Sequence, residues 1–191
     1  GVITLMPNEY TQVLGITSTN VIVTNTTTLT SIFSESIPGG TLEDHNRLRW
    51  DMQGEISFHA QNAECAVYSY YGGLTVASCT IKNIAAGARE HKGLRVTAEV
   101  SGDGSVNSQC GLVHSYVGLP RNEDGSTPIG FGSVGVSSNG DQDFEVKVKW
   151  ASAGASSSFV HTHSSLELLS YVEDVAIDAL DDPTAYIFIN S

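Results

Sequence analysis

Hydrophobic and polar residues alternate with a period of two along most of this chain, and helical periodicity is nearly absent. Residues 143–150 (DFEVKVKW) place four large apolar side chains on one face and charged side chains on the other: Phe144, Val146, Val148 and Trp150. Residues 93–100 (GLRVTAEV) and residues 55–60 (EISFHA) alternate in the same way. Each segment is therefore predicted to be a half-buried strand.

Glycine and proline residues separate the predicted strands. The stretch IPGG at residues 37–40 ends an incoming strand, because Pro38 lacks an N–H and the two glycines permit a tight turn. Gly72 and Gly73 lie between two strand-like segments, CAVYSYY and LTVASCTI, and predict a hairpin. Three large apolar residues share one side of the strand that follows IPGG: Leu48, Trp50 and Met52. This pattern indicates a sandwich, a jelly roll or a barrel.

The charge balance of the chain is strongly acidic. The sequence has 21 Asp and Glu residues against 9 Lys and Arg residues, which gives a formal net charge of -12. This excess argues against nucleic acid as a partner, because phosphates are bound by clustered Lys and Arg. It also disfavours an anionic membrane surface, and no apolar run approaches the ~20 residues of a membrane span. Such acidity is typical of a soluble protein present in many copies.

The cysteine count and spacing favour reduced thiols. Cys65, Cys79 and Cys110 are three in number and show no CxxC spacing, which argues against a disulfide framework or a zinc ribbon. Cys65 and Cys79 flank the predicted hairpin almost symmetrically, so a bridge between them is the one alternative. Assembly in a reducing compartment is the simpler interpretation.

One histidine pair raises the question of a metal site. In VHTHSSLELL, residues 160–169, His161, His163 and Glu167 have the same parity and would share a face on a regular strand. The spacing H-x-H-x3-E resembles the first metal motif of cupins, jelly rolls that bind Fe, Mn or Ni. A cupin also needs a downstream motif with another histidine, and none of the 24 residues after Glu167 is a histidine. We therefore expect no metal and no cofactor, and both histidines on a hydrated outer face or near a subunit axis.

Other candidate sites also have simpler explanations. No GxSxG elbow is present, so the abundant serines do not indicate a hydrolase. Four aromatic residues could form a carbohydrate platform, although a core or subunit contact is favoured: Tyr68, Tyr70, Tyr71 and Trp50. Two acidic pairs lack the spacing of a calcium loop and are expected in solvated turns: Glu43 with Asp44, and Glu123 with Asp124. We therefore expect no catalytic site.

Five stretches together resemble a jelly-roll module of tailed-bacteriophage structural proteins, which occurs in head decorations and in tail-fibre tips. They are SIFSESIPGGTL, NRLRWDMQGEIS, YYGGLTVAS, GLRVTAEV and DQDFEVKVKWASAGASSSFVHTHSSLELLS. The resemblance covers roughly residues 30–170 and carries no site residue. It implies an all-β jelly-roll sandwich of about eight to ten antiparallel strands. It also implies a non-enzymatic virion protein, usually a homotrimer, that contacts other virion proteins of the capsid or tail.

These observations lead to one expected organisation. Residues 1–29 form an extended N-terminal segment that anchors the domain or pairs between subunits, residues 30–170 form the jelly roll, and residues 171–191 form a C-terminal segment. Because no heptad shaft or collagen-like run is present, we expect a protein that decorates and reinforces the virion surface after assembly in the host cytoplasm. The alternatives are a receptor-binding fibre tip that recognises host surface glycan and, below it, a cupin-like metalloenzyme.

Overall fold

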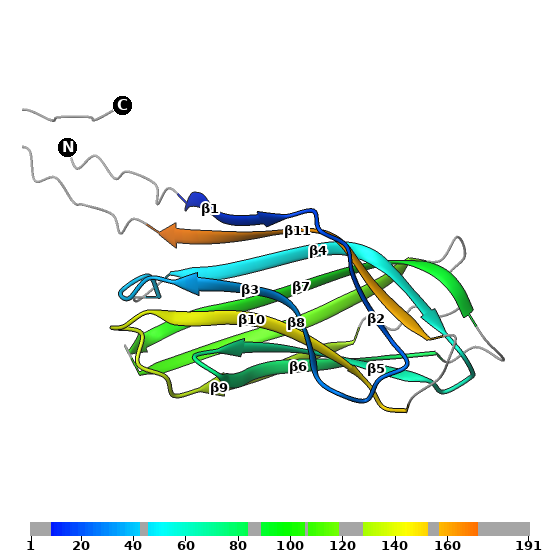
Figure 1. The fold of residues 1–191 in the computed structure, drawn as a ribbon. Coiled ribbons are helices and arrows are strands. Elements are labelled where there is room, and N and C mark those ends of the chain that lie inside the picture. Colours follow the sequence, from blue (N-terminus) through cyan, green and yellow to red (C-terminus); the bar gives the residue numbers. More distant parts are fainter. Residues whose placement is uncertain are drawn as a thin grey trace, which may run out of the picture.

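Two antiparallel β-sheets pack face to face in the computed structural model (Figure 1). The structure describes residues 9–42, 46–83, 89–105, 107–118, 128–152 and 157–171. Within these ranges it contains eleven strands, and no helix there has the length and hydropathy to cross a membrane. The chain is therefore an all-β sandwich, as the period-two alternation predicts.

The larger sheet has seven strands. In spatial order these are β1 (Glu9–Thr17), β11 (Ser158–Tyr171), β4 (Arg47–Phe58), β7 (Arg89–Ser105), β8 (Ser108–Gly118) and β9 (Ile129–Val134), and β2 (Val21–Thr24) also pairs with β11. The smaller sheet has the order β3 (Thr30–Ile37), β10 (Gln142–Trp150), β5 (Glu64–Tyr71) and β6 (Leu74–Lys82).

The strand pairing has jelly-roll topology. β1 and β2 pair with β11, β3 pairs with β10, β4 with β7, and β5 with β6, and successive pairs alternate between the two sheets. Such nested antiparallel pairs form the two Greek keys of a jelly roll. Along the chain, β8 and β9 are an addition to this pattern that follows β7 and precedes β10, and in the larger sheet they extend the edge beyond β7. β1 and β2, which come from the segment that the sequence places ahead of the domain, also join the larger sheet.

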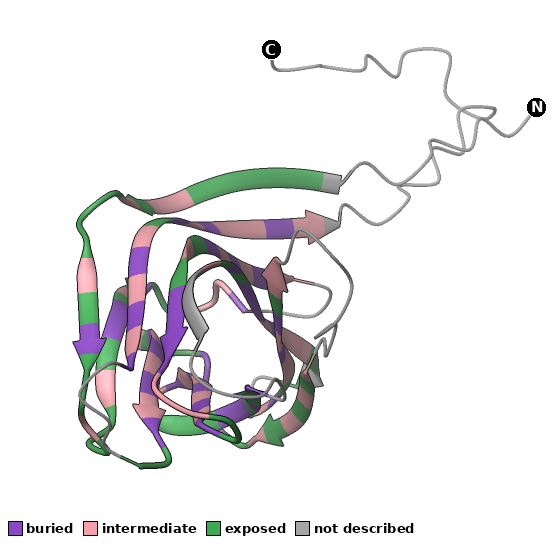
Figure 2. Ribbon diagram, turned by 90° about the vertical axis from the view of Figure 1, so that its right-hand side faces the viewer, coloured by how far each residue is buried: buried purple, intermediate pink, exposed green. Residues whose placement is uncertain are grey.

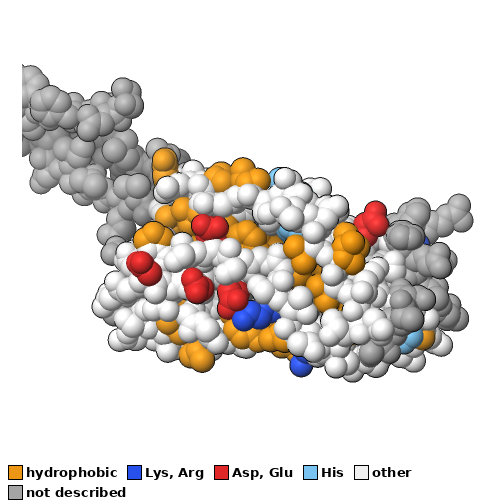
Figure 3. All heavy atoms as spheres, in the orientation of Figure 1, with side chains coloured by type: hydrophobic (Ala, Val, Ile, Leu, Met, Phe, Trp, Pro, Cys, Tyr) orange, Lys and Arg blue, Asp and Glu red, His pale blue; other side chains and the backbone are white. Residues whose placement is uncertain are grey.

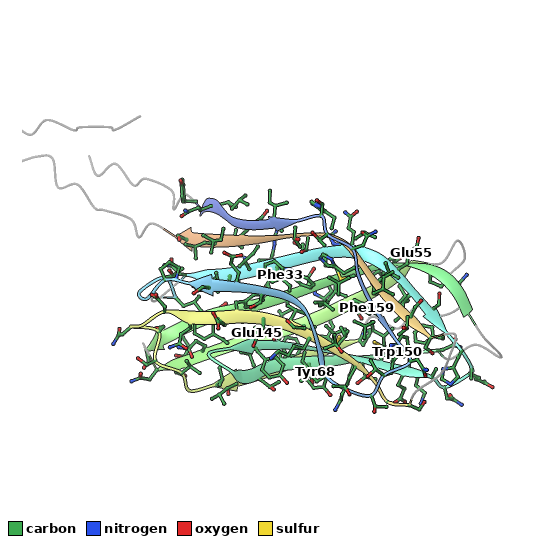
Figure 4. All side chains as sticks on the ribbon, in the orientation of Figure 1. Phe33, Glu55, Tyr68, Glu145, Trp150 and Phe159 are labelled. Atoms are coloured by element: carbon green, nitrogen blue, oxygen red, sulfur yellow. The ribbon has the colours of Figure 1, made fainter. Side chains whose placement is uncertain are left out.

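Apolar side chains from both sheets fill the sandwich interior. Buried residues occur on strands of both layers (Figure 2). The Trp50 ring lies 5.6 Å from that of Phe33, and the Trp150 ring lies 5.8 Å from that of Phe58, measured between centroids. Phe33, Trp150 and Phe159 lie between the two layers (Figure 4). Burial of each such large side chain stabilises the fold by about 1.5–3 kcal/mol.

The turns that the sequence predicts are also present. Gly72 and Gly73 connect β5 to β6 with φ values of 57° and 78°. β3 ends at Ile37, and Gly40 follows in the turn with a φ of 80°. β4 then buries Leu48, Trp50 and Met52 on one face, as their alternation predicts.

Candidate functional site

The H-x-H-x3-E motif lies on β11, where a β-bulge separates its members. His161 and His163 lie opposite successive residues of β4, so Thr162 between them is the extra residue. The extra residue reverses the alternation of inward and outward side chains, so two residues an even number of positions apart across the bulge face opposite sides of the sheet. His161 is fully buried, whereas His163 is exposed and Glu167 is partly exposed. The prediction that the three side chains share one face is therefore wrong.

His161 is a core residue. Its ring stacks on Trp50 with 6.2 Å between centroids and an interplanar angle of 10°. Nδ1 lies 3.1 Å from the carbonyl oxygen of Thr19, and Nε2 lies 2.9 Å from the hydroxyl of Ser164. Because a carbonyl oxygen only accepts, Nδ1 carries the proton and Nε2 accepts from Ser164. Burial lowers the pKa of His161, which favours this neutral form.

The expectation of a hydrated outer face is therefore wrong for His161 and holds only for the exposed His163. Among the residues that the structure describes, no three His, Cys, Asp or Glu side chains come together as metal ligands. Cys65 and Cys79 are buried free thiols, and Cys110 is an exposed free thiol. The two acidic loop pairs lie outside the described residues: Glu43 with Asp44, and Glu123 with Asp124.

The four aromatic residues considered as a carbohydrate platform do not share a surface. Trp50 and Tyr71 are fully buried in the core. Tyr68 lies on β5 of the smaller sheet (Figure 4). Tyr70 lies on the same strand, and 6.4 Å separates the two ring centroids. Lys147 Nζ lies 4.6 Å from the ring centroid of Tyr70, a cation–π arrangement.

On the side of the molecule that carries β3 and β10, acidic side chains lie next to a small basic cluster (Figure 3).

A polar hollow of about 400 Å³ lies on the outer face of the larger sheet. Its lining side chains come from β4, β7 and β8, which are neighbouring strands (Figure 1). These side chains are Arg49, Asp51, Arg95, Thr97, Glu99, His114 and Tyr116. The outer-face hollow combines hydrogen-bond donors, acceptors and one aromatic ring on a rigid sheet.

Strand register explains why the outer-face hollow forms. Asp51, Thr97 and His114 lie opposite one another on β4, β7 and β8, so they make one row across the sheet. The rows on either side carry the longer side chains of Arg49 with Glu99 and of Arg95 with Tyr116. A short threonine in the middle row, flanked by these longer side chains, leaves the depression.

The carboxylate of Asp51 organises the polar groups of the outer-face hollow. Oδ1 accepts a hydrogen bond from Thr97 Oγ1 at 2.5 Å, and Arg95 Nη2 lies 3.3 Å from the same oxygen. Oδ2 lies 3.2 Å from Arg49 Nε. Glu167 lies 3.7 Å from Arg49 Nη2, so this member of the supposed metal motif belongs to the ion-pair network.

Exposed apolar side chains border the outer-face hollow on β8 and β9. Tyr116 is 54% exposed, Ile129 is 55% exposed and Phe131 is 76% exposed. In the β8–β9 register, Ile129 lies opposite His114, and Phe131 lies opposite Leu112. β9 also crosses close over β6, because a Cβ atom on Gly130 would lie only 1.6 Å from the Ser78 carbonyl oxygen.

The sequence contained one signal for the outer-face hollow. Arg47, Arg49 and Asp51 alternate with buried residues after the IPGG turn, so they belong to an exposed strand face. Their partners Thr97 and Glu99 lie about fifty residues later, and only the β4–β7 register brings them together. The sequence analysis therefore missed this site.

Comparisons with known proteins find distant structural similarity and no family. No family model and no curated protein matches the chain. Among solved structures, the CBM2 module of the Lactobacillus casei BL23 phage J-1 evolved Dit is 12% identical, with a TM-score of 0.37 over 72% of this chain and 68% of that chain. Lectin UEA-II complexed with galactose is 10% identical, with a TM-score of 0.37 over 87% and 94% of the two chains. Peanut lectin with a 9mer peptide is 10% identical, with a TM-score of 0.34 over 90% and 99%. At these scores the likeness carries no argument about either fold or function.

Proposed function

We propose that this chain is a non-enzymatic structural protein of a tailed-phage virion, displayed on the particle surface, where it binds and reinforces the shell. The observation that carries the proposal is a jelly roll whose interior is filled mainly by apolar side chains. Among the residues that the structure describes, no cluster of metal-binding groups lies in this interior. The cupin-like alternative requires His161, His163 and Glu167 around one interior cavity, and the bulge in β11 separates them.

Self-association into a trimer is part of this proposal. β1 is an edge strand of the larger sheet, and its exposed apolar residues Tyr10, Val13 and Ile16 are between 51% and 66% exposed. Ile22 of β2 is 62% exposed. An exposed apolar edge strand favours coverage by another chain, and closed symmetry is the usual result.

The proposed location is tested by labelling intact particles with an antibody against this chain. We expect the label on the exterior of intact virions. Label that appears only after the particles are disrupted, or that never copurifies with them, would contradict a surface role. Sedimentation of the purified protein tests the trimer separately, and a stable 20.3 kDa monomer at micromolar concentration would remove it.

Recognition of host surface carbohydrate is the second candidate function. The outer-face hollow favours it, because the hollow places fixed polar groups next to exposed apolar and aromatic side chains. Binding and reinforcement at the particle surface do not need such a hollow, so the two functions can be tested independently.

A further inference from the structure

We propose that the outer-face hollow and the adjoining surface of β8 and β9 form a binding site for an uncharged oligosaccharide. The inference rests on the second candidate function and does not depend on where the chain sits in a virion. Its evidence is the arrangement of three features on one sheet face: a hydrogen-bonding floor, an apolar border and balanced local charge.

The polar floor is held in place before any ligand binds. Asp51 is fixed by Thr97, Arg95 and Arg49 at distances of 2.5 to 3.3 Å. Glu99 is paired with Arg47 at 3.3 Å and is only 16% exposed. Carboxylates and guanidinium groups held next to each other can accept from and donate to adjacent hydroxyl groups of a sugar. Arg95 is 62% exposed, so its remaining N–H groups are accessible to such a ligand.

The border supplies ring faces and apolar area at two separated points. Phe131 of β9 lies opposite Leu112 of β8. Leu112 is four positions from Tyr116, which corresponds to about 14 Å along the strand. A single pyranose ring is too short to contact both aromatic side chains, whereas a chain of several rings can bridge them. Ile129 lies between these points, beside His114. An oligosaccharide that lies along β8 would therefore touch all three exposed apolar residues.

The charge of the outer-face hollow favours an uncharged ligand. Arg49 and Arg95 are balanced by Asp51 and Glu99 within the lining, while the whole chain has a formal net charge of -12. A polyanionic glycan would be repelled by the acidic protein and would compete with Asp51 for both arginines. Hydroxyl groups bind without breaking these ion pairs. If the ion pairs served only to stabilise the sheet, the three exposed apolar residues beside them would have no explanation.

The test uses the full chain on an array of bacterial surface oligosaccharides that includes uncharged and anionic members, followed by calorimetry on each hit. The site variants are Tyr116→Ala, Phe131→Ala and Arg95→Met. The matched controls are Leu74→Ala, an exposed apolar residue on β6 of the smaller sheet, and Lys82→Met, an exposed cation that is paired with Glu64 on the same sheet at 3.0 Å. Urea unfolding of every variant checks the fold, and the 76% exposure of Phe131 makes its replacement the one least able to disturb folding.

We expect binding to uncharged members, with affinity reduced about tenfold or more by each site variant and changed less than about twofold by each control. Affinity should also be insensitive to salt, since no net charge is neutralised. Three results would overturn the proposal: no binding to any oligosaccharide, equal binding by site variants and controls, or binding confined to anionic members and lost in salt. None of these results would affect the proposed reinforcing role.

Discussion

Gly54 is the residue on which the bulged pairing of β4 and β11 depends. A Cβ atom at this position would lie 1.9 Å from the Val160 carbonyl oxygen and 2.9 Å from Met52 Cε, far inside the 3.4 Å at which ordinary contact begins. Met52 can move its flexible end, but the Val160 oxygen belongs to the backbone of β11. Gly54→Ala must therefore displace one strand from the other beside the bulge at Thr162.

The expected cost has two parts. Strain from overpacking a closely packed position costs about 1–3 kcal/mol. A displaced strand also loses one or two ladder hydrogen bonds at about 1 kcal/mol each. We expect the free energy of unfolding to fall by about 2–5 kcal/mol, a large part of the roughly 5–15 kcal/mol of a typical domain. With a urea m value of about 2 kcal/mol/M, the midpoint should fall by about 1–2.5 M.

Urea unfolding, followed by the fluorescence of the two buried tryptophans, measures this cost. The matched control is Gly93→Ala on the neighbouring strand β7, where an added Cβ atom meets nothing within 4 Å. That substitution should change stability by less than about 1 kcal/mol and can raise it, because alanine restricts the unfolded chain. Equal midpoints for Gly54→Ala and Gly93→Ala would refute the bulged register and the buried position of His161 that follows from it.

Three further predictions concern the remaining titratable and reactive side chains. Because burial lowers the folded-state pKa of His161 below the unfolded value of 6.5, its contribution to stability is complete above pH 6.5 and is lost as the pH falls through the folded pKa. Urea midpoints between pH 7.5 and pH 5 should show this loss in the wild type and not in His161→Gln. In the native protein a thiol reagent should modify only Cys110, because burial raises the pKa of Cys79 to about 11 and that of Cys65 further. Three thiols should react after denaturation, and a count of one would indicate a disulfide. Elemental analysis should find no stoichiometric transition metal, and about one Fe, Mn, Ni or Zn per chain that is lost in His161→Ala would revive the cupin-like alternative.

The strands and their inward faces could be predicted from the sequence because alternation directly encodes half-burial. Phe144, Val146 and Val148 of β10 are fully buried, as their spacing indicates. The same rule failed at His161, because one extra residue in a bulge reverses the parity without changing the pattern of residue types. Parity therefore assigns faces only where a strand is regular.

The outer-face hollow could not be predicted from the sequence because it is a product of register. Asp51 and Thr97 are 46 positions apart, and His114 is a further 17 positions along the chain. Each residue has an ordinary place on an exposed strand face, and only the order β4, β7, β8 puts the three in one row. The sequence does show that the outward residues of β4 are charged, which is the part of the site that local alternation can reveal.

The central proposal is that this jelly roll reinforces the virion surface, and phage particles that lack the protein test it most directly. Apolar area buried against the shell would stabilise the particle by roughly 25 cal/mol per Å². We expect particles without the protein to assemble, to adsorb normally, and to break more readily than complete particles under heat or osmotic shock. Particles that are equally robust yet fail to adsorb to their host would contradict the reinforcing role and establish receptor recognition in its place.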